Sequence, residues 1–243
     1  DDDDENTWTP LQLAAAQGDL PLVKQLLTQQ PPAPPNDPNS APRGYYGQTA
    51  LQAASLNGHL AVVETLLRAG AAVDLPGGNN GGRTALALAA GAGHLGIVRH
   101  LVDAAGAEIN RAAHKYNGRT ALQAAAREGH DAVVERLLQH PDRVEVNAPA
   151  VRYQGVTALQ GAAGAGHRAT VRRLLAAGAD VNAPGGQYKG YTALAAAAEG
   201  GHGEVVRGLL EAGADVSMRS GNKMWTAARV AVSRGHGEIA QLL

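Results

Sequence analysis

The sequence predicts an all-α repeat solenoid that forms a single domain over residues 1–243. Three observations predict it: a Thr opens an apolar segment seven times at intervals of 34 to 40 residues, a Gly follows each Thr nine residues later, and the apolar residues have helical spacing. The recurring residues are Thr9, Thr49, Thr84, Thr120, Thr157, Thr192 and Thr226, with Gly18, Gly58, Gly93, Gly129, Gly166, Gly201 and Gly235.

Each repeat is predicted to contain two short helices joined by a turn. After Thr49, Leu51 and Ala54 give a first apolar face, and Gly58 is where that helix should stop, since Gly tolerates a left-handed C-terminal cap. Beyond it, the pairs 62–63 and 66–67 are apolar at i, i+4 spacing, which predicts the second helix.

A Gly-rich and Pro-rich connection leads from each second helix to the next Thr, as in residues 181–184. We expect it to form a protruding loop or β-hairpin, here called a finger. The segment 30–46 contains PPAPP and is predicted to be a stiff, extended loop. Two repeats carry one extra residue, near Ala105 and Pro141, and the last has Met224 where others have Gly before the Thr.

Composition excludes several classes of protein. The chain has no Cys, so it has neither disulfides nor a thiolate nucleophile, and its 44% hydrophobic content includes only 3% aromatic residues. The formal net charge is -1, but an acidic, flexible tail over residues 1–6 holds five acids and leaves 21 basic and 17 acidic residues elsewhere. No window is apolar enough for a membrane span, so we expect an intracellular protein, cytoplasmic or nuclear.

The repeat resembles an ankyrin repeat. The residues that carry the resemblance are Gly155 to Leu159, then Ala162-Ala163, Gly166-His167, Leu174-Leu175 and Ala177 to Asn182, and the pattern recurs over residues 7–243. The Ala-Leu-Gln and Asn-Ala-Pro segments are similar to those of large fungal ankyrin proteins. The resemblance implies about seven helix-turn-helix units in a right-curved stack with a concave groove.

Histidines are the first candidates for metal ligands or catalysts. Six of them follow the second Gly of a repeat, at His59, His94, His130, His167, His202 and His236. Stacked helices lie about 8 to 10 Å apart, whereas zinc ligands lie about 2.0 to 2.1 Å from the metal, so neighbouring histidines do not share an ion. The resemblance implies that they tie turns together by hydrogen bonds.

No enzyme motif is found with its structural context. GGNNGGRT at residues 77–84 approaches a phosphate-binding loop, but Gly82 and Thr84 are repeat positions and no strand precedes them. We therefore expect no catalysis, no metal and no cofactor.

Candidate binding residues are the aromatic and basic residues of the fingers. Four tyrosines stand four residues before a Thr, and the last four fingers carry seven basic residues and no acid. Exposed Tyr and Arg are typical of protein-binding hot spots; the alternative is that the rings pack finger on finger and the charges are solvated. The resemblance adds contacts on the concave face, just before the Thr and seven or eight residues after it, including Ser233 and Arg234.

Combined, these criteria predict partner contacts at Tyr45, Tyr46, Leu56, Asn57, Arg83, Tyr116, Arg119, Arg127, Glu128, Arg152, Tyr153, Tyr188, Lys189, Tyr191, Glu199, Lys223 and Trp225.

The sequence therefore favours a non-catalytic module that binds a protein or peptide, with an acidic partner favoured by the finger charges. In a special case, residues 1–5 of the same or a neighbouring molecule occupy that site, so that their deletion raises affinity for an acidic partner. The alternative is a structural or regulatory segment of a larger receptor-like or enzyme-linked protein, packing in cis or self-associating. Nucleic-acid binding is a weaker third option, recognisable by steep salt dependence, and we expect the chain to be part of a larger protein.

Overall fold

The computed structural model describes residues 8–28, 36–41, 47–76, 83–112, 119–140, 142–150, 155–186 and 190–243. The acidic tail and most of the Pro-rich segment 30–46 lie outside these residues. Two compact units make up the chain, residues 1–121 and 122–243. The regular secondary structure of the described residues is helical, apart from one isolated β-bridge between Ser220 and Trp225.

Helices of the first unit are α1 (Pro10–Gln17), α2 (Leu20–Thr28), α3 (Ala50–Leu56), α4 (Leu60–Arg68), α5 (Ala85–Gly91), α6 (Leu95–Arg99) and the π-helix η2 (His100–Ala104). Helices of the second unit are α7 (Ala121–Glu128), α8 (Asp131–Leu138), α9 (Ala158–Gly164), α10 (Arg168–Ala176), α11 (Ala193–Gly200), α12 (Gly203–Glu211), α13 (Ala227–Arg234) and α14 (Gly237–Leu242). Ala121, the first residue of α7, is the last residue of the first unit.

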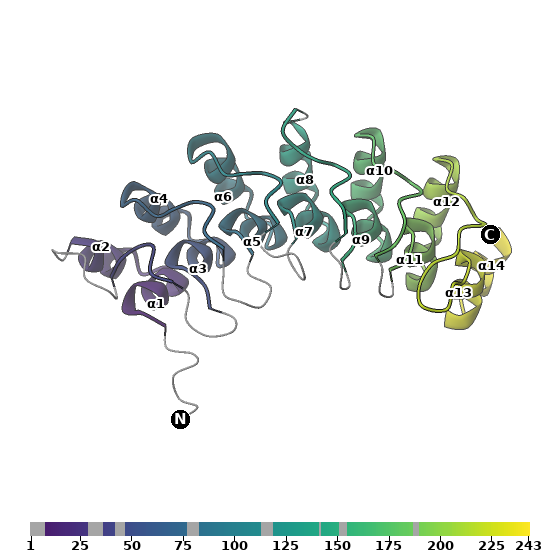
Figure 1. Ribbon diagram of the computed structural model, residues 1–243, viewed down its shortest axis with the longest axis horizontal. Coiled ribbons are helices and arrows are strands. Elements are labelled where there is room, and N and C mark those ends of the chain that lie inside the picture. Colours follow the sequence, from purple (N-terminus) through teal and green to yellow (C-terminus); the bar gives the residue numbers. More distant parts are fainter. Residues whose placement is uncertain are drawn as a thin grey trace, which may run out of the picture. The chain divides into compact units, whose positions relative to one another are not determined.

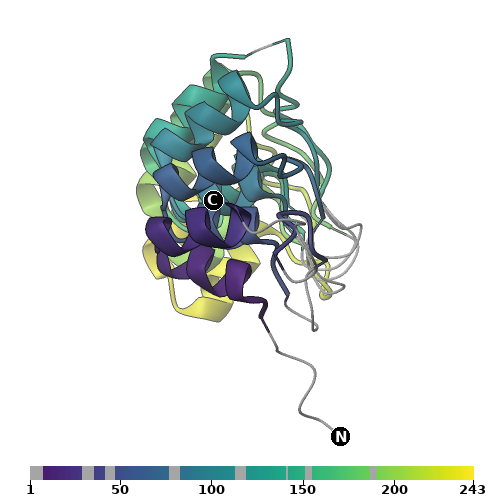
Figure 2. The same cartoon turned by 90° about the vertical axis from the view of Figure 1, so that its left-hand side faces the viewer.

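Helices within each unit form two rows. In the first unit, α3 packs between α1 and α5, and α4 packs between α2 and α6 (Figure 1). In the second, α11 packs between α9 and α13, while α10 packs between α8 and α12. The connections that follow α4 and η2 leave on the same side of the two rows (Figure 2). The predicted all-α repeat fold is therefore confirmed.

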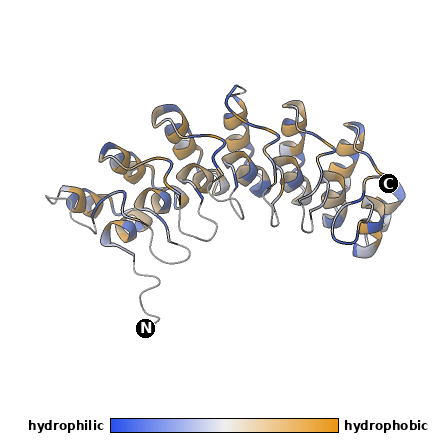
Figure 3. Cartoon of the chain, in the orientation of Figure 1, coloured by the Kyte–Doolittle hydropathy of each residue, from blue (hydrophilic) through white to orange (hydrophobic). Residues whose placement is uncertain are grey.

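The core consists of small and aliphatic side chains that face neighbouring helices. The Leu two residues after each of the first six threonines is at most 2% exposed, and Ala54, Ala90 and Ala163 are completely buried. Orange hydrophobic segments alternate with blue polar ones along the helices (Figure 3). Each buried Leu contributes about 1.5–3 kcal/mol, and the alanines let the helix rows approach closely.

The Thr of each repeat starts the first helix because its side chain caps the free backbone N–H groups. The Thr157 hydroxyl accepts a hydrogen bond from the Gln160 N–H at 3.2 Å, and the Gln160 side chain accepts one from the Thr157 N–H at 3.0 Å. This is a capping box. Gln160 Nε2 also donates to the carbonyls of Ala183 and Pro184, both at 3.0 Å, and so anchors the following connection.

The Gly at the end of the first helix makes room for the His of the next repeat, as at Gly18, Gly58, Gly129, Gly166 and Gly201. Gly166 has φ +79°, and a Cβ built there would lie 2.6 Å from Nδ1 of His202. His202 Nε2 donates to the Gly164 carbonyl at 3.1 Å, and His59, His94, His167 and His236 make the equivalent bond to the preceding repeat at 2.9–3.1 Å. The predicted role of these histidines in tying turns together is confirmed.

The extra residue near Ala105 is absorbed inside a helix. The second helix of that repeat changes from α to π at His100, and Gly106 then resumes the left-handed cap with φ +70°. Ala107 N–H consequently donates to the carbonyl of Leu101, six residues back, whereas Ala71 in the preceding repeat donates five residues back. Such π turns accommodate a single inserted residue. Pro141, the second predicted insertion, lies outside the described residues.

Candidate functional site

The predicted binding residues divide into those the structure describes and those it does not. Outside the described residues lie Tyr45, Tyr46, Tyr116, Arg152, Tyr153, Tyr188 and Lys189, so their contacts stay predictions. Placed by the structure are Leu56, Asn57, Arg83, Arg119, Arg127, Glu128, Tyr191, Glu199, Lys223 and Trp225.

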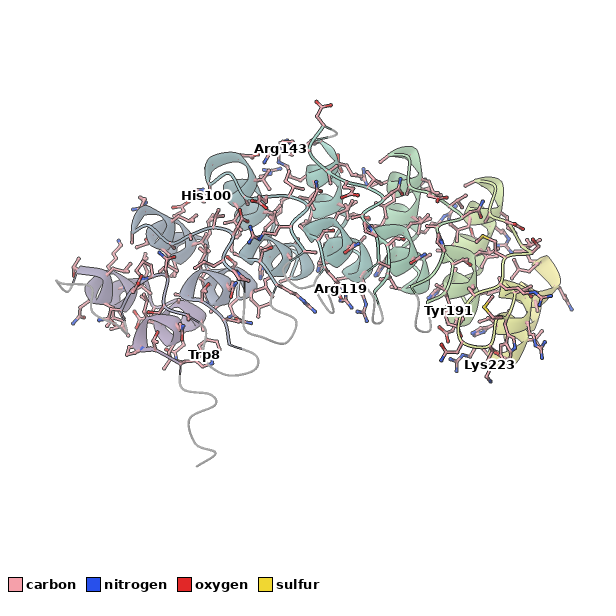
Figure 4. All side chains as sticks on the ribbon, in the orientation of Figure 1. Trp8, His100, Arg119, Arg143, Tyr191 and Lys223 are labelled. Carbon is pink, nitrogen blue, oxygen red and sulfur yellow. The ribbon has the colours of Figure 1, made fainter. Side chains whose placement is uncertain are left out.

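In the first unit, the predicted residues that the structure describes lie at or just before helix ends. The Leu56 carbonyl accepts the hydrogen bond of His94 at 2.9 Å, and the Asn57 side chain donates to the Ala53 carbonyl at 2.9 Å. Arg83 and Arg119 are half-buried and precede α5 and α7. Figure 4 labels Arg119 on the segment that enters α7.

At the end of α7, Arg127 and Glu128 are both exposed. A Cβ built on Gly161 of α9 would lie 3.3 Å from the Arg127 Cβ, so the base of this arginine packs against the next helix. Its backbone carbonyl accepts from His167 at 3.0 Å. Only the outer part of the Arg127 side chain is available to a partner.

The last finger is a short β-hairpin that leads into α13. Ser220 and Trp225 exchange backbone hydrogen bonds at 3.0 and 3.1 Å, and the Met224 N–H donates to the Gly221 carbonyl at 3.1 Å. Met224 closes the turn with φ +48°, a left-handed conformation rare for a residue with a side chain. Its side chain is 59% exposed.

Two cations that come from different elements lie over the Trp225 ring. Lys223 Nζ lies 4.4 Å from the ring centroid, and the Arg229 guanidinium, one turn into α13, lies 5.0 Å from it. Both distances are within the range of cation–π attraction. The ion pairs of Glu135, Glu199 and Glu204 in the described part of the second unit are made with Arg173, Arg234, Arg168 and Arg207, and not with Lys223 or Arg229.

Tyr191 connects the last finger to a second charged group. A Cβ on Gly221 would lie 2.7 Å from the Tyr191 ring, and the Gly221 N–H donates to the Gly190 carbonyl at 2.9 Å, so the finger rests on the segment before α11. Glu199 at the end of α11 pairs with Arg234 of α13 at 2.5 Å. Burial raises the pKa of the Tyr191 hydroxyl, Glu199 raises it further, and Arg234 opposes the shift.

We call the group formed by Tyr191, Glu199, Lys223, Met224, Trp225, Arg229 and Arg234 the finger surface. Tyr191 and Lys223 are labelled on it in Figure 4. Four residues of the predicted set, Tyr191, Glu199, Lys223 and Trp225, are brought together here with Arg234, which the resemblance implied as a concave-face contact. Arg229 was not among the predicted residues, although its repeat differs from the others at this position: the residue three after the Thr is Gln in four repeats, Ala in two and Arg only after Thr226.

A separate cavity of about 620 Å³ lies in the first unit, between α4 and the π-helix η2. Its charged groups satisfy one another: Glu64 lies 3.8 Å from Arg68 and 4.0 Å from His100. The remaining lining residues are the apolar Leu67, Ala71, Val73, Ala104 and Ala105. His100 is labelled in Figure 4.

Within the described ranges, no cluster of three or more His, Cys, Asp or Glu residues is arranged to hold a metal ion. No helix of the same ranges is both long and hydrophobic enough to cross a bilayer.

Comparisons with known proteins agree with this architecture. The family described as "Ankyrin repeats (3 copies)" matches overlapping segments that together span residues 11–243. The crystal structure of the human ASB11 ankyrin repeat domain is similar to this chain with a TM-score of 0.76 and 29% sequence identity, over 96% of both chains. No curated protein matches. Ankyrin repeats are generally non-enzymatic protein–protein interaction modules, and this chain belongs to the ankyrin-repeat family.

Proposed function

We propose that the chain binds a protein or peptide partner through the finger surface, without catalysis. The observation that supports the proposal most directly is the pair of exposed cations, Lys223 and Arg229, which lie on one indole ring with no described ion-pair partner. Trp and Arg supply large contact areas and dominate the binding energy of many interfaces.

The finger surface also includes a second group, Tyr191, Glu199 and Arg234, whose side chains are held by contacts with other parts of the chain. Tyr191 is half-buried against Gly221, and the Glu199–Arg234 pair fixes the end of α11 to α13. A surface that is ordered before binding loses less conformational entropy when a partner arrives. The proposed partner therefore contacts a preformed site.

Selection of binders from an unbiased display library of protein fragments tests this proposal. Hydrogen exchange of the complex should show protection at residues 190–191 and 220–229, and Trp225→Ala should weaken the selected binders about tenfold or more. Ser217→Ala, a change on the same connection away from the indole, is the matched control and should bind as the wild type does. Protection confined to α8, α10 and α12, or no binder at all, would contradict the proposal.

A further inference from the structure

We infer that the Trp225 end of the finger surface recognises an extended acidic peptide, whose carboxylates meet Lys223 and Arg229 and whose neighbouring apolar side chain contacts Met224. The inference rests on the proposed function and adds the chemical class of the partner.

Arg229 occupies a position that serves the fold in other repeats. Gln12, Gln52, Gln123 and Gln160 stand there in four repeats and Ala87 and Ala195 in two, and all six are at most 2% exposed. Arg229 keeps the backbone part of that role, since its N–H donates to the Thr226 hydroxyl at 3.4 Å, but its side chain is exposed and lies over Trp225. The change of residue at this position adds a positive charge to the surface.

Charge is distributed unevenly over the finger surface. Arg234 is neutralised by Glu199 at 2.5 Å, whereas Lys223 and Arg229 have no carboxylate within 4.0 Å among the described residues. Two positive charges therefore remain uncompensated around one ring. The complementary ligand carries at least two negative charges.

The indole ring also holds the two cations in place. Lysine and arginine side chains otherwise lose rotamer entropy when a ligand immobilises them. Because the ring already attracts both groups, part of that cost is absent when an anion binds.

The hairpin backbone disfavours a compact phosphate as the ligand. Enclosed phosphate sites use free backbone N–H groups. Here the N–H groups of Ser220, Gly221, Met224 and Trp225 all donate to carbonyls of the chain itself. What remains is an open surface with two side-chain cations from separate elements, which suits carboxylates spaced along a peptide.

Met224 supplies the apolar contact beside these charges. Its left-handed backbone, with φ +48°, holds the side chain 59% exposed next to Lys223 and Trp225. Residues held in sparsely populated conformations are concentrated at functional sites, and the flexible thioether adapts to different apolar partners.

Fluorescence of Trp225 provides the experiment. Trp8 and Trp225 are the only tryptophans, so a Trp8→Phe version of the 243-residue chain reports on Trp225 alone. Three short peptides serve as probes: one rich in Asp and Glu with a single Leu, its Asn and Gln counterpart, and a phosphoserine peptide without other acids. Lys223→Gln and Arg229→Gln are the test variants. Arg172→Gln is the matched control, because Arg172 is exposed on α10 of the same unit.

We expect the acidic peptide to change the fluorescence, with each test variant weakening its binding about three- to fivefold and the double variant about tenfold or more. Met224→Ser should also weaken binding of the acidic peptide, and Arg172→Gln should leave that binding unchanged. Added salt should reduce the affinity. The amide peptide should bind at least tenfold more weakly.

Equal binding of the amide peptide, full affinity in the double variant, or preference for phosphoserine or single-stranded nucleic acid would overturn the inference. The proposed function is still supported after any of these outcomes if display-selected binders protect the finger surface from hydrogen exchange. If no selected binder protects that surface, the proposed function is contradicted as well. An acidic peptide that binds only after deletion of residues 1–5 would support the inference and identify the acidic tail as a competitor.

Discussion

The repeats that begin at Thr157 and Thr226 use one helix position in two ways. In the first, Gln160 is buried, completes a capping box and holds the next connection by two hydrogen bonds. In the second, Arg229 retains only its backbone bond to the Thr cap, and its exposed side chain lies over the half-buried indole of Trp225. The comparison shows that the cap fixes the backbone of this position, while the side chain is free to serve either the core or the surface.

The largest expected effect is the difference in stability lost when Gln160 or Arg229 is replaced by Leu. Gln160→Leu leaves the Thr157 N–H and the carbonyls of Ala183 and Pro184 without their partners, and we expect it to destabilise the chain by about 2–4 kcal/mol. Arg229→Leu should cost less than about 0.5 kcal/mol, because no buried group depends on that side chain. Urea unfolding followed by circular dichroism measures both, and equal losses would contradict the comparison.

The turn glycines of the same two repeats differ in what lies beside them. Gly166 and Gly235 have φ of +79° and +82°, but a new Cβ at Gly166 would meet the His202 ring at 2.6 Å, whereas nothing lies within 4 Å at Gly235. Gly235→Ala should cost about 1–2 kcal/mol for the left-handed backbone alone. Gly166→Ala should cost at least about 1 kcal/mol more. The difference in thermal unfolding between the two variants isolates the contact with the histidine.

The strained turn of the last finger offers a smaller effect of opposite sign. Met224→Gly removes the Cβ from a left-handed conformation, which should stabilise the folded chain by about 1–2 kcal/mol. The greater chain entropy of Gly in the unfolded state offsets part of this gain. The net stabilisation should be about 0.5 kcal/mol. A slightly raised unfolding temperature is expected. Met224→Ala, which keeps a Cβ in the same conformation, is the control and should not be stabilising. A gain in both variants would show that the backbone is not the cause.

The smallest expected effect concerns Tyr191, which touches the last finger and faces the Glu199–Arg234 pair. Its pKa is raised in the folded chain, so the associated stability is full below the ordinary value of about 10 and is lost as pH rises through the folded pKa. Glu199→Gln removes a charge that raises this pKa, which should then fall. NMR titration with labelled tyrosine measures it, and an unchanged or increased pKa would contradict the proposed electrostatic contact.

Much of the fold follows from residues that repeat. Thr157, Gly166 and His202 recur at fixed spacing, and each has a local task that the residue type itself indicates: capping a helix, adopting positive φ, and reaching a neighbouring carbonyl. The extra residue near Ala105 was also visible in the sequence. Its absorption as a π turn was not, because that choice depends on how the helix packs against α4.

The site was only partly predictable. Tyr191 and Trp225 were expected on the fingers because exposed aromatic residues are typical of binding surfaces. The pairing of Glu199 with Arg234 joins residues 35 positions apart, and the position of Arg229 over Trp225 requires the hairpin to turn at Met224. Spacing alone gives neither the rotamers nor the hairpin geometry that create these contacts.

The histidine of each repeat has a further, mechanical consequence. Because His202 closes the end of α9 and His236 closes the end of α11, each turn is sealed by the repeat that follows it. Suppose that a stretching force applied to the second unit pulls α13 and α14 away first. The hydrogen bond of His236 at the end of α11 is then lost, and the force next acts on α11 and α12. We expect such a unit to unfold one helix pair at a time, in similar steps. The force needed should depend on the weakest of these histidine hydrogen bonds and not on the total buried area.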